Sequence, residues 1–140
     1  METNIKQHLA QQPLKLNGKE KFSLQKRRKS FEYAWQGILH FLRSEHNART
    51  HLVATVGVSC LAVYVHVHKV EAIALILSMA FVWMMEMINT ALEAAMDLVS
   101  PGRHPLVRIV KDMAAGAVLV AALAAALVGC IIFLPKLFIL

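Results

Sequence analysis

Cysteine is scarce in this sequence: Cys60 and Cys130 are the only two among 140 residues, and each lies alone in an apolar run. Both are interpreted as small buried hydrophobic residues, so neither a disulfide nor a cysteine metal site is expected. The sequence also lacks a Gly-rich phosphate loop and a His-Glu-x-x-His pattern, which excludes the common nucleotide-binding and zinc-hydrolase motifs. No secretory signal is predicted, because the first 30 residues contain no apolar core.

Apolar residues, by contrast, make up 57% of the chain and form three long runs. The runs are Leu52–Val67, Val70–Met85 and Met113–Leu134. A helix needs about 20 residues to cross a bilayer, with a range of roughly 17–25, so each run is long enough once its neighbours are included. We therefore expect an all-α membrane protein with transmembrane helices at about 50–67, 70–98 and 107–134.

A polar and basic segment precedes these runs. Residues 1–25 are expected to form a flexible polar tail, which leaves residues 26–140 as the membrane domain. Lys26–Lys29 are all basic, and apolar residues recur at helical spacing from Phe31 to Leu42. This pattern predicts an amphipathic surface helix at about 30–46, with Tyr33 and Trp35 at the level of the lipid headgroups.

Positive charge is concentrated near the N-terminus, where ten of the 15 Lys and Arg residues precede residue 50. The imbalance indicates an anionic partner. Lipid headgroups or a nucleotide are preferred to nucleic acid, because the basic segment leads directly into membrane runs. By the positive-inside rule, the N-terminus and the loop around Ser100–Pro105 lie in the cytoplasm and the C-terminus lies outside.

The most informative stretch is Glu86–Asp97, in which acids enter a helix that began as an apolar run. At about 100° per residue, its polar residues share one stripe roughly 100° wide. They are Glu86, Asn89, Thr90, Glu93 and Asp97. Carboxylates on a membrane helix cost energy unless they pair, bind cations or line a wet cavity. The stripe is therefore a candidate functional site, although Asp97 taken alone is better interpreted as a solvated acid.

The predicted topology brings further charges to the depth of this acid stripe. Glu45 precedes the first membrane run and Lys111 precedes the third. Glu45 and Glu93 would supply oxygens to Mg²⁺, which prefers carboxylate and phosphate ligands, and Lys111 would supply a charge for phosphate. Glu86, which lies deeper, is suited to accept a proton from a lipid hydroxyl. The set predicts phosphoryl transfer to a lipid.

Two other interpretations remain open from the residues alone. A small oligomeric transporter or channel would line an ion path with the acid stripe. A structural subunit would only pair the acids with Lys111 and Arg108. Asn89 is suited equally to bonding across helices and to contacting a substrate. Glu45 is either solvated or paired with Arg49.

Four motifs resemble those of the prokaryotic diacylglycerol kinase / undecaprenol kinase family of small integral membrane lipid kinases. They are Tyr33-Ala34-Trp35-Gln36-Gly37, Glu45-His46-Asn47-Ala48-Arg49, the Glu86–Asp97 stretch and Lys111-Asp112-Met113-Ala114-Ala115-Gly116. The resemblance implies a homotrimer in the bacterial cytoplasmic membrane, with three transmembrane helices and one surface helix per protomer and with active sites between subunits. It also implies transfer of the γ-phosphate of ATP, with Mg²⁺, to diacylglycerol or undecaprenol.

The resemblance also implies roles for individual residues. Glu86 is expected to act as the base on the lipid hydroxyl, Asn89 to support it, and Glu45 and Glu93 to hold the metal and the nucleotide. The other implied ATP contacts are Lys26, Arg27, Tyr33, Gly102, Arg103, His104, Lys111 and Asp112. The lipid contacts are assigned to Ser30, Trp35, Asn47, Glu86 and Ala115.

Two departures from the family pattern leave choices open. Many relatives carry an Arg seven residues before the nucleotide-binding Tyr, where this chain has Lys26 followed by Arg27. Which of the two contacts nucleotide stays open, since Lys cannot form the bidentate phosphate fork. Ala114-Ala115 replaces the Gly-Ser of one diacylglycerol kinase branch, and this brings the chain nearer to the undecaprenol kinases. The lipid therefore stays open.

Overall fold

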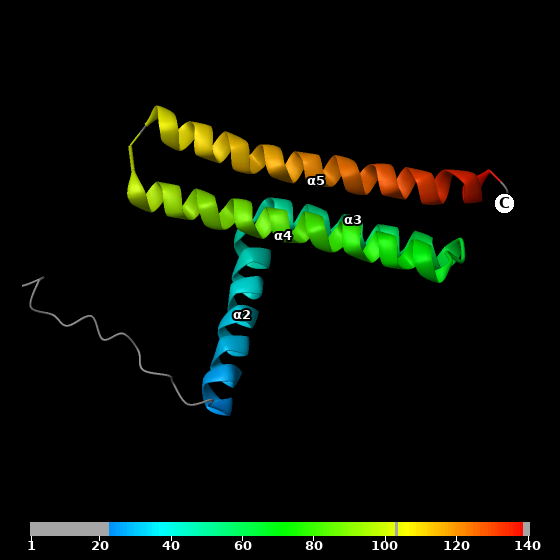
Figure 1. Ribbon diagram of the computed structural model, residues 1–140, viewed down its shortest axis with the longest axis horizontal. Coiled ribbons are helices and arrows are strands. Elements are labelled where there is room, and N and C mark those ends of the chain that lie inside the picture. The colour runs from blue at the N-terminus through cyan, green and yellow to red at the C-terminus, as the bar shows by residue number, and fades with distance from the viewer. Residues whose placement is uncertain (1–22, 103, 139–140) are drawn as a thin grey trace, which may run out of the picture. The chain divides into compact units, whose positions relative to one another are not determined.

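The computed structural model describes residues 23–102 and 104–138, and these residues form four α-helices and no strands (Figure 1). The helices are α2 (Leu24–Ser44), α3 (His46–Tyr64), α4 (Lys69–Val99) and α5 (Pro105–Leu137). The chain divides into two units after Trp35. The all-α prediction is confirmed. Most of the predicted tail, residues 1–22, lies outside the described residues.

Helix α2 begins at Leu24, earlier than the predicted start near residue 30, so the basic residues Lys26–Lys29 belong to the helix rather than to a segment before it. The Ser30 hydroxyl donates to the Lys26 carbonyl oxygen at 3.1 Å, as is common for a serine inside a helix. Tyr33 and Trp35 are 65% and 61% exposed. A basic helix with exposed aromatic side chains fits an interfacial position.

The second unit begins within α2 and contains the other three helices. Glu45 has an extended backbone, with φ −98° and ψ 127°, and it separates α2 from α3. Helix α3 ends in a tight turn in which His66 has a φ of 51° and the Val67 N–H donates to the Ala62 carbonyl oxygen at 3.1 Å. This turn reverses the chain, so α4 returns alongside α3.

Helices α4 and α5 form an antiparallel pair that packs over most of its length (Figure 1). One ion pair joins the two helices at each end: Asp97 to Lys111 at 2.5 Å, and Glu71 to Lys136 at 3.0 Å. At about 1.5 Å per residue, the two pairs are roughly 39 Å apart along α4. They fix the register and place Glu86 level with Ala121 and Ala122.

The loop between α4 and α5 follows from its residue types. Pro101 cannot continue a helix, and α4 ends before it at Val99. Pro105 occupies the first turn of α5, where its missing N–H leaves no bond unmade. The His104 Nδ1 accepts a hydrogen bond from the Leu106 N–H at 3.2 Å and so caps α5.

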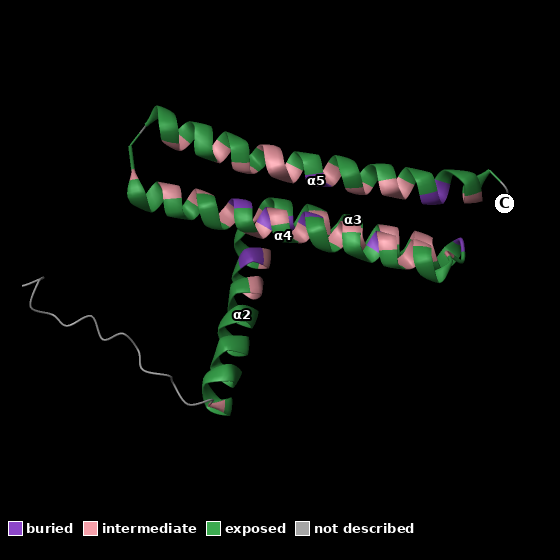
Figure 2. Cartoon of the chain, viewed as in Figure 1, coloured by how far each residue is buried: buried purple, intermediate pink, exposed green. Residues whose placement is uncertain are grey.

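Helices α4 and α5 are long and apolar enough to cross a membrane, and no other helix in the described ranges meets both conditions. The prediction of three spans is therefore supported for two. Helix α3 does not qualify because its first turns are polar, with His46, Asn47, Arg49 and His51. Figure 2 shows that exposed residues cover much of α4 and α5. Such apolar surface needs lipid or another protein chain around it.

The buried core of the described residues is small and lies toward the end marked by the Glu71–Lys136 ion pair. It consists of Val65, Leu75, Ile132 and Phe133, contributed by the turn after α3 and by α4 and α5. At the other side of this core, Phe41 contacts the Trp83 ring edge to face, with ring centres 6.1 Å apart. The three membrane-region helices are thus connected mainly through α4.

Candidate active site

Two residues of the acid stripe are buried, and they are the only buried polar or charged residues in the described ranges. Glu86 is 2% exposed and Asn89 is 8% exposed. Both lie on the same face of α4, about one turn apart. On α5 the residue level with Glu86 is Ala121, which is itself buried and small enough to let the helices approach closely. The sequence prediction that Glu86 and Asn89 belong together is compatible with this arrangement.

Asn89 is only partly satisfied. Its Nδ2 donates to the Glu93 Oε1 at 3.1 Å along the same helix. Its Oδ1 is buried and has no hydrogen-bond partner among the described residues. Leaving a buried acceptor unpaired costs about 1–3 kcal/mol. The Asn89 Oδ1 is therefore available to accept a hydrogen bond from a donor outside the described residues.

Glu86 also differs from the other acids of α4 and α5. No ion pair or hydrogen bond to its side chain occurs within residues 23–102 and 104–138, whereas Asp97, Asp112 and Glu71 each pair with a cation. A buried group of this kind is costly unless it serves a purpose or gains a partner. The structural-subunit interpretation thus describes Asp97 and Asp112, but it does not describe Glu86.

Lys111, predicted to contact phosphate, is held by an ion pair. Its Nζ lies 2.5 Å from the Asp97 Oδ1, and the two side chains are 30% and 66% exposed. The neighbouring Arg108 and Asp112 pair along α5 at 3.6 Å. Exposed pairs contribute about 0–1 kcal/mol. A phosphate group would therefore displace Asp97 from Lys111 at little cost.

Glu45 lies at the start of α3 and is half-buried. It accepts a long hydrogen bond of 3.5 Å from the Ser44 hydroxyl. The predicted alternative of a Glu45–Arg49 pair is wrong, because the Arg49 Nη2 instead donates to the Arg43 carbonyl oxygen at 2.7 Å. Within the described part of the chain, no three His, Cys, Asp or Glu side chains gather closely enough to hold a metal ion.

The remaining predicted site residues are not brought into one place. Asn47, Gly102, His104, Asp112 and Ala115 are exposed on the second unit. Arg103 lies outside the described residues. The residues assigned to the first unit are Lys26, Arg27, Ser30, Tyr33 and Trp35. The acid stripe and the Lys111 end of α5 are therefore the part of the predicted site that the second unit assembles by itself.

One polar cluster was not predicted. The Trp83 Nε1 donates to the Thr55 Oγ1 at 2.9 Å, which joins α4 to α3. The His51 ring lies beside the Trp83 ring, with centres 6.5 Å apart. A buried tryptophan N–H usually finds an acceptor. The sequence therefore contained an indication of this cluster, because Thr55 and His51 are among the few polar residues near the first apolar run.

Comparison with known proteins gives a consistent result. A family model described as prokaryotic diacylglycerol kinase matches residues 32–133. These residues include the whole acid stripe, Glu45, and the Lys111-Asp112 motif. The match covers well over half of the chain.

Several curated relatives carry related names. A diacylglycerol kinase of Synechocystis sp. is 41% identical over 109 residues, which cover 77% of this chain and 62% of that protein. An undecaprenol kinase of Bacillus subtilis is 38% identical over 109 residues, which cover 78% and 89%. A diacylglycerol kinase of Escherichia coli is 31% identical over 104 residues, which cover 74% and 85%. The chain thus spans less than two thirds of the Synechocystis relative.

Proposed function

The chain belongs to the prokaryotic diacylglycerol kinase family, and we propose that it transfers the γ-phosphate of ATP to the hydroxyl of a membrane lipid alcohol. The observations that carry this proposal are Glu86, which is 2% exposed and has no ion pair or hydrogen bond to its side chain within the described residues, and the buried Asn89 Oδ1 one turn away, which has no hydrogen-bond partner there. Two unpaired acceptors on one face of a membrane helix suit a ligand that brings a hydroxyl donor. A lipid alcohol is such a ligand.

In this proposal Glu86 accepts the proton of the lipid hydroxyl as the hydroxyl oxygen forms a bond to the γ-phosphorus. The bond from that phosphorus to the β–γ bridging oxygen breaks, and ADP leaves. Asn89 orients that hydroxyl or the Glu93 carboxylate, to which its Nδ2 already donates. General-base catalysis of this kind contributes about 10²–10⁴-fold to the rate. Burial on α4 keeps water away from the carboxylate, so transfer to the lipid competes well with hydrolysis.

The nucleotide would bind at the Lys111 end of α5. Lys111 exchanges Asp97 for phosphate oxygens, and Asp112 and Glu45 lie on segments that border the same end of the membrane region. Lys26 or Arg27, Tyr33, Gly102, Arg103 and His104 complete the proposed ATP contacts. We assign the lipid contacts besides Glu86 to Ser30, Trp35, Asn47 and Ala115.

The donor set suits a magnesium ion. Mg²⁺ binds proteins through one or two carboxylates and completes its shell with phosphate oxygens and water. Among the described residues, no group of three His, Cys, Asp or Glu side chains could form a metal cage. Glu45 and Glu93 would hold the ion, which would neutralise charge on the phosphates.

The proposal includes an assembly and a topology. We propose a homotrimer in the bacterial cytoplasmic membrane with active sites between copies, in which α3 is the third span and α2 lies on the cytoplasmic surface. The N-terminus is cytoplasmic and the C-terminus is outside. Support comes from the exposed apolar faces of α4 and α5, which call for lipid or neighbouring chains, and from the excess of basic residues before residue 50.

The decisive test is phosphate transfer from labelled ATP by the purified protein, with diacylglycerol and undecaprenol offered in parallel. Glu86→Gln should lower transfer by at least about 100-fold, because it removes the base. Glu32→Gln, on an exposed residue of α2, is the matched control and should keep full activity. Transfer to one lipid only identifies the substrate.

One result would contradict the role of Glu86, and another would contradict the kinase itself. Unchanged transfer by Glu86→Gln would remove Glu86 from the mechanism. ATP-independent ion flux through protein in liposomes, with no lipid phosphorylation, would favour the ion-path alternative. Circular dichroism of both variants should match the parent protein, which separates a chemical loss from a folding loss.

A further inference from the structure

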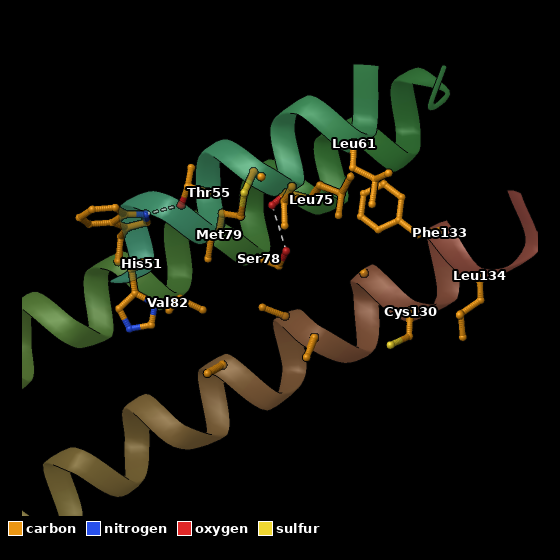
Figure 3. Close-up of a pocket in the computed structure, with 18 residues that line it drawn as sticks. His51, Thr55, Leu61, Leu75, Ser78, Met79, Val82, Cys130, Phe133 and Leu134 are labelled. Atoms are coloured by element: carbon orange, nitrogen blue, oxygen red, sulfur yellow. Dashed lines mark hydrogen bonds between the residues drawn. The ribbon is translucent and has the colours of Figure 1, made fainter. Parts of the chain in front are cut away.

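Trp83 joins α4 to two other helices, one turn before Glu86. Its Nε1 donates to the Thr55 Oγ1 of α3 at 2.9 Å, and this bond is the dashed line that reaches Thr55 in Figure 3. Its ring contacts Phe41 of α2 edge to face and lies beside His51 of α3, with ring centres 6.1 and 6.5 Å away. Three side chains from two helices therefore hold one residue of α4.

We call residues 41–55 the α2–α3 corner, and this segment is packed around two buried side chains. Phe41 is 5% exposed and Ala48 is completely buried. Ala48 and Thr55 are about two helical turns apart, so they share one face of α3. Glu45 lies in the same corner, between α2 and α3. A residue of α4 that is fixed to this corner is therefore also fixed relative to Glu45.

The Trp83–Thr55 hydrogen bond lies in apolar surroundings. Both residues line a cavity between α3, α4 and α5 whose other walls are mostly apolar (Figure 3). The Ser78 hydroxyl, another polar group of this cavity, donates to the Leu75 carbonyl oxygen at 2.9 Å. Without the Thr55 hydroxyl the indole N–H would lose its acceptor, and a donor left unpaired in such surroundings is costly. The bond therefore favours one rotation of α4 against α3.

The rotation of α4 sets where the Glu86 carboxylate points. Trp83 precedes Glu86 by about 4.5 Å along the helix axis and lies about 60° from it around the axis. A side-chain end lies about 5–6 Å from the axis, so a rotation of about 10° would move it by about 1 Å. A shift of about 1 Å in a catalytic group can lower the rate about 100-fold. On the α5 side, the residues level with Glu86 are Ala121 and Ala122, whose small side chains restrict rotation little.

We propose that Trp83 and Thr55 are positioning residues, whose hydrogen bond fixes the rotation of α4 against the α2–α3 corner and so directs the Glu86 carboxylate at the lipid hydroxyl. The inference rests on the proposed kinase function, and both residues act through Glu86. Every copy of a symmetric oligomer repeats the same corner, so Glu86 is directed in the same way whether one site takes Glu45 and Glu86 from one copy or from two. Loss of the bond therefore lowers kcat rather than the affinity for ATP.

Matched substitutions on α3 test the pair. Thr55→Val removes the acceptor and keeps a similar shape, so kcat should fall about 10- to 100-fold while the KM values for ATP and lipid stay within about twofold. Thr55→Ser keeps a hydroxyl and should hold kcat within about threefold of the parent protein. Ser59→Ala is the control, because it removes a hydroxyl that donates within its own helix, to the Thr55 carbonyl oxygen at 2.7 Å. This control should keep full activity.

A double variant separates stability from activity. Thr55→Val alone leaves the Trp83 N–H without its acceptor and should lower the thermal unfolding temperature in micelles. Thr55→Val/Trp83→Phe removes both partners, so the unfolding temperature should recover, whereas kcat should stay low because the bond that sets the rotation is missing. Recovery of kcat together with stability, or a kcat for Thr55→Val equal to that of Ser59→Ala, overturns the inference. A higher KM for lipid at unchanged kcat also overturns it, since Thr55 would then be a lipid contact.

A cysteine-labelling experiment without ATP separates this inference from the kinase assignment. In a protein that lacks Cys60 and Cys130, Glu86→Cys should react slowly with N-ethylmaleimide, because the position is buried. Adding Thr55→Val should speed that reaction severalfold, and adding Ser59→Ala should leave it unchanged. Equal rates in the three proteins overturn the positioning inference, whatever the kinase assay shows. If the rates differ as expected but the parent protein phosphorylates neither lipid, the kinase assignment alone is overturned.

Discussion

Glu86 and Asn89 are two polar residues of α4 whose burial costs folding free energy and whose proposed role is in the active site. A carboxylate and an amide oxygen are buried in an otherwise apolar region, and neither has a partner in the described chain. Unpaired polar groups at such positions destabilise the fold. In the proposed function, a bound hydroxyl ligand would supply the donor that these two groups lack.

Asn89→Leu should separate stability from activity. The substitution removes the unpaired Oδ1, so the free energy of unfolding in detergent should stay the same or rise by about 1 kcal/mol. Transfer of phosphate should fall more than tenfold, because the amide no longer orients the hydroxyl or Glu93. Thermal unfolding and the kinase assay measure the two effects. A loss of stability above about 2 kcal/mol would instead mean that Asn89 bonds across helices for structure.

Sequence reasoning worked well for these residues for a physical reason. Polar side chains stand out against an apolar helix, so Glu86, Asn89 and Glu93 could be placed on one face from spacing alone. It did not decide the partner of Glu45, for which a pair with Arg49 was one of two alternatives. Helical spacing brings residues four apart within reach, but it does not reveal that a backbone carbonyl, here that of Arg43, will be the better acceptor.

At the scale of helices, the α4–α5 pair is held by two ion pairs of unequal exposure. The Glu71 and Lys136 side chains are 28% and 20% exposed, whereas Asp97 in the other pair is 66% exposed. Glu71 also accepts the His68 backbone N–H at 2.7 Å and so caps the start of α4. The two pairs should therefore contribute differently, one to stability and one to nucleotide binding.

Lys136→Met should lower the free energy of unfolding, because it removes the cation that pairs with Glu71 at 3.0 Å. The double variant Glu71→Gln/Lys136→Met should recover part of that loss. Equilibrium unfolding in mixed micelles measures both. An unchanged stability for the single variant would show that Glu71 is fully solvated in the membrane-bound protein.

Lys111→Met should behave in the opposite way. The free energy of unfolding of this variant should differ from that of the parent protein by less than about 1 kcal/mol, since the Lys111–Asp97 pair is exposed. Its KM for ATP should rise at least tenfold, because phosphate loses a cation. Asp97→Asn, which frees Lys111, should leave KM equal or lower. An equal rise in KM for Asp97→Asn and Lys111→Met would mean that Asp97 itself contacts the nucleotide.

Helix existence followed from apolar periodicity, but two boundaries did not. Helix α2 starts at Leu24 rather than near residue 30 because its basic residues are good helix formers, whereas the prediction began the helix only where apolar residues recur. Helix α3 ends at Tyr64, where a left-handed residue, His66, makes the turn. Non-glycine residues rarely adopt a left-handed backbone conformation, so no pattern in the sequence predicts it at His66.

At the scale of the whole molecule, the helices leave most of their apolar surface uncovered, with Leu119, Leu123 and Leu127 among many exposed residues of α5. Lipid or another protein chain must cover it. Assembly could not be derived from one chain's spacing, and the proposed trimer rests on the family resemblance. The proposal that active sites are shared between copies leads to a test of its own.

Mixed oligomers should recover activity. Glu45→Gln and Glu86→Gln are each expected to be inactive alone. If each site takes these two residues from different copies, coassembly at equal amounts should restore about a quarter of the sites by random mixing in a symmetric ring. The kinase assay on coexpressed variants measures this. No recovery would place both residues in sites formed by a single copy.

The orientation in the membrane is testable with single cysteines in a protein that lacks Cys60 and Cys130. Lys69→Cys, at the start of α4, should react with a membrane-impermeant thiol reagent on intact cells. Gly102→Cys, in the opposite loop where an added Cβ meets nothing within 4 Å, should react only after lysis. The reverse pattern would invert the proposed topology.

The separation of the two ion pairs has a further consequence for how the α4–α5 pair fits into a bilayer. A hairpin whose end charges are roughly 39 Å apart is longer than a hydrocarbon layer of about 30 Å. It must tilt, or one end must protrude into the headgroup region. Either response shifts Glu86 relative to the surface from which nucleotide arrives. Turnover should therefore vary with bilayer thickness, even when the substrate lipid and the protein are unchanged.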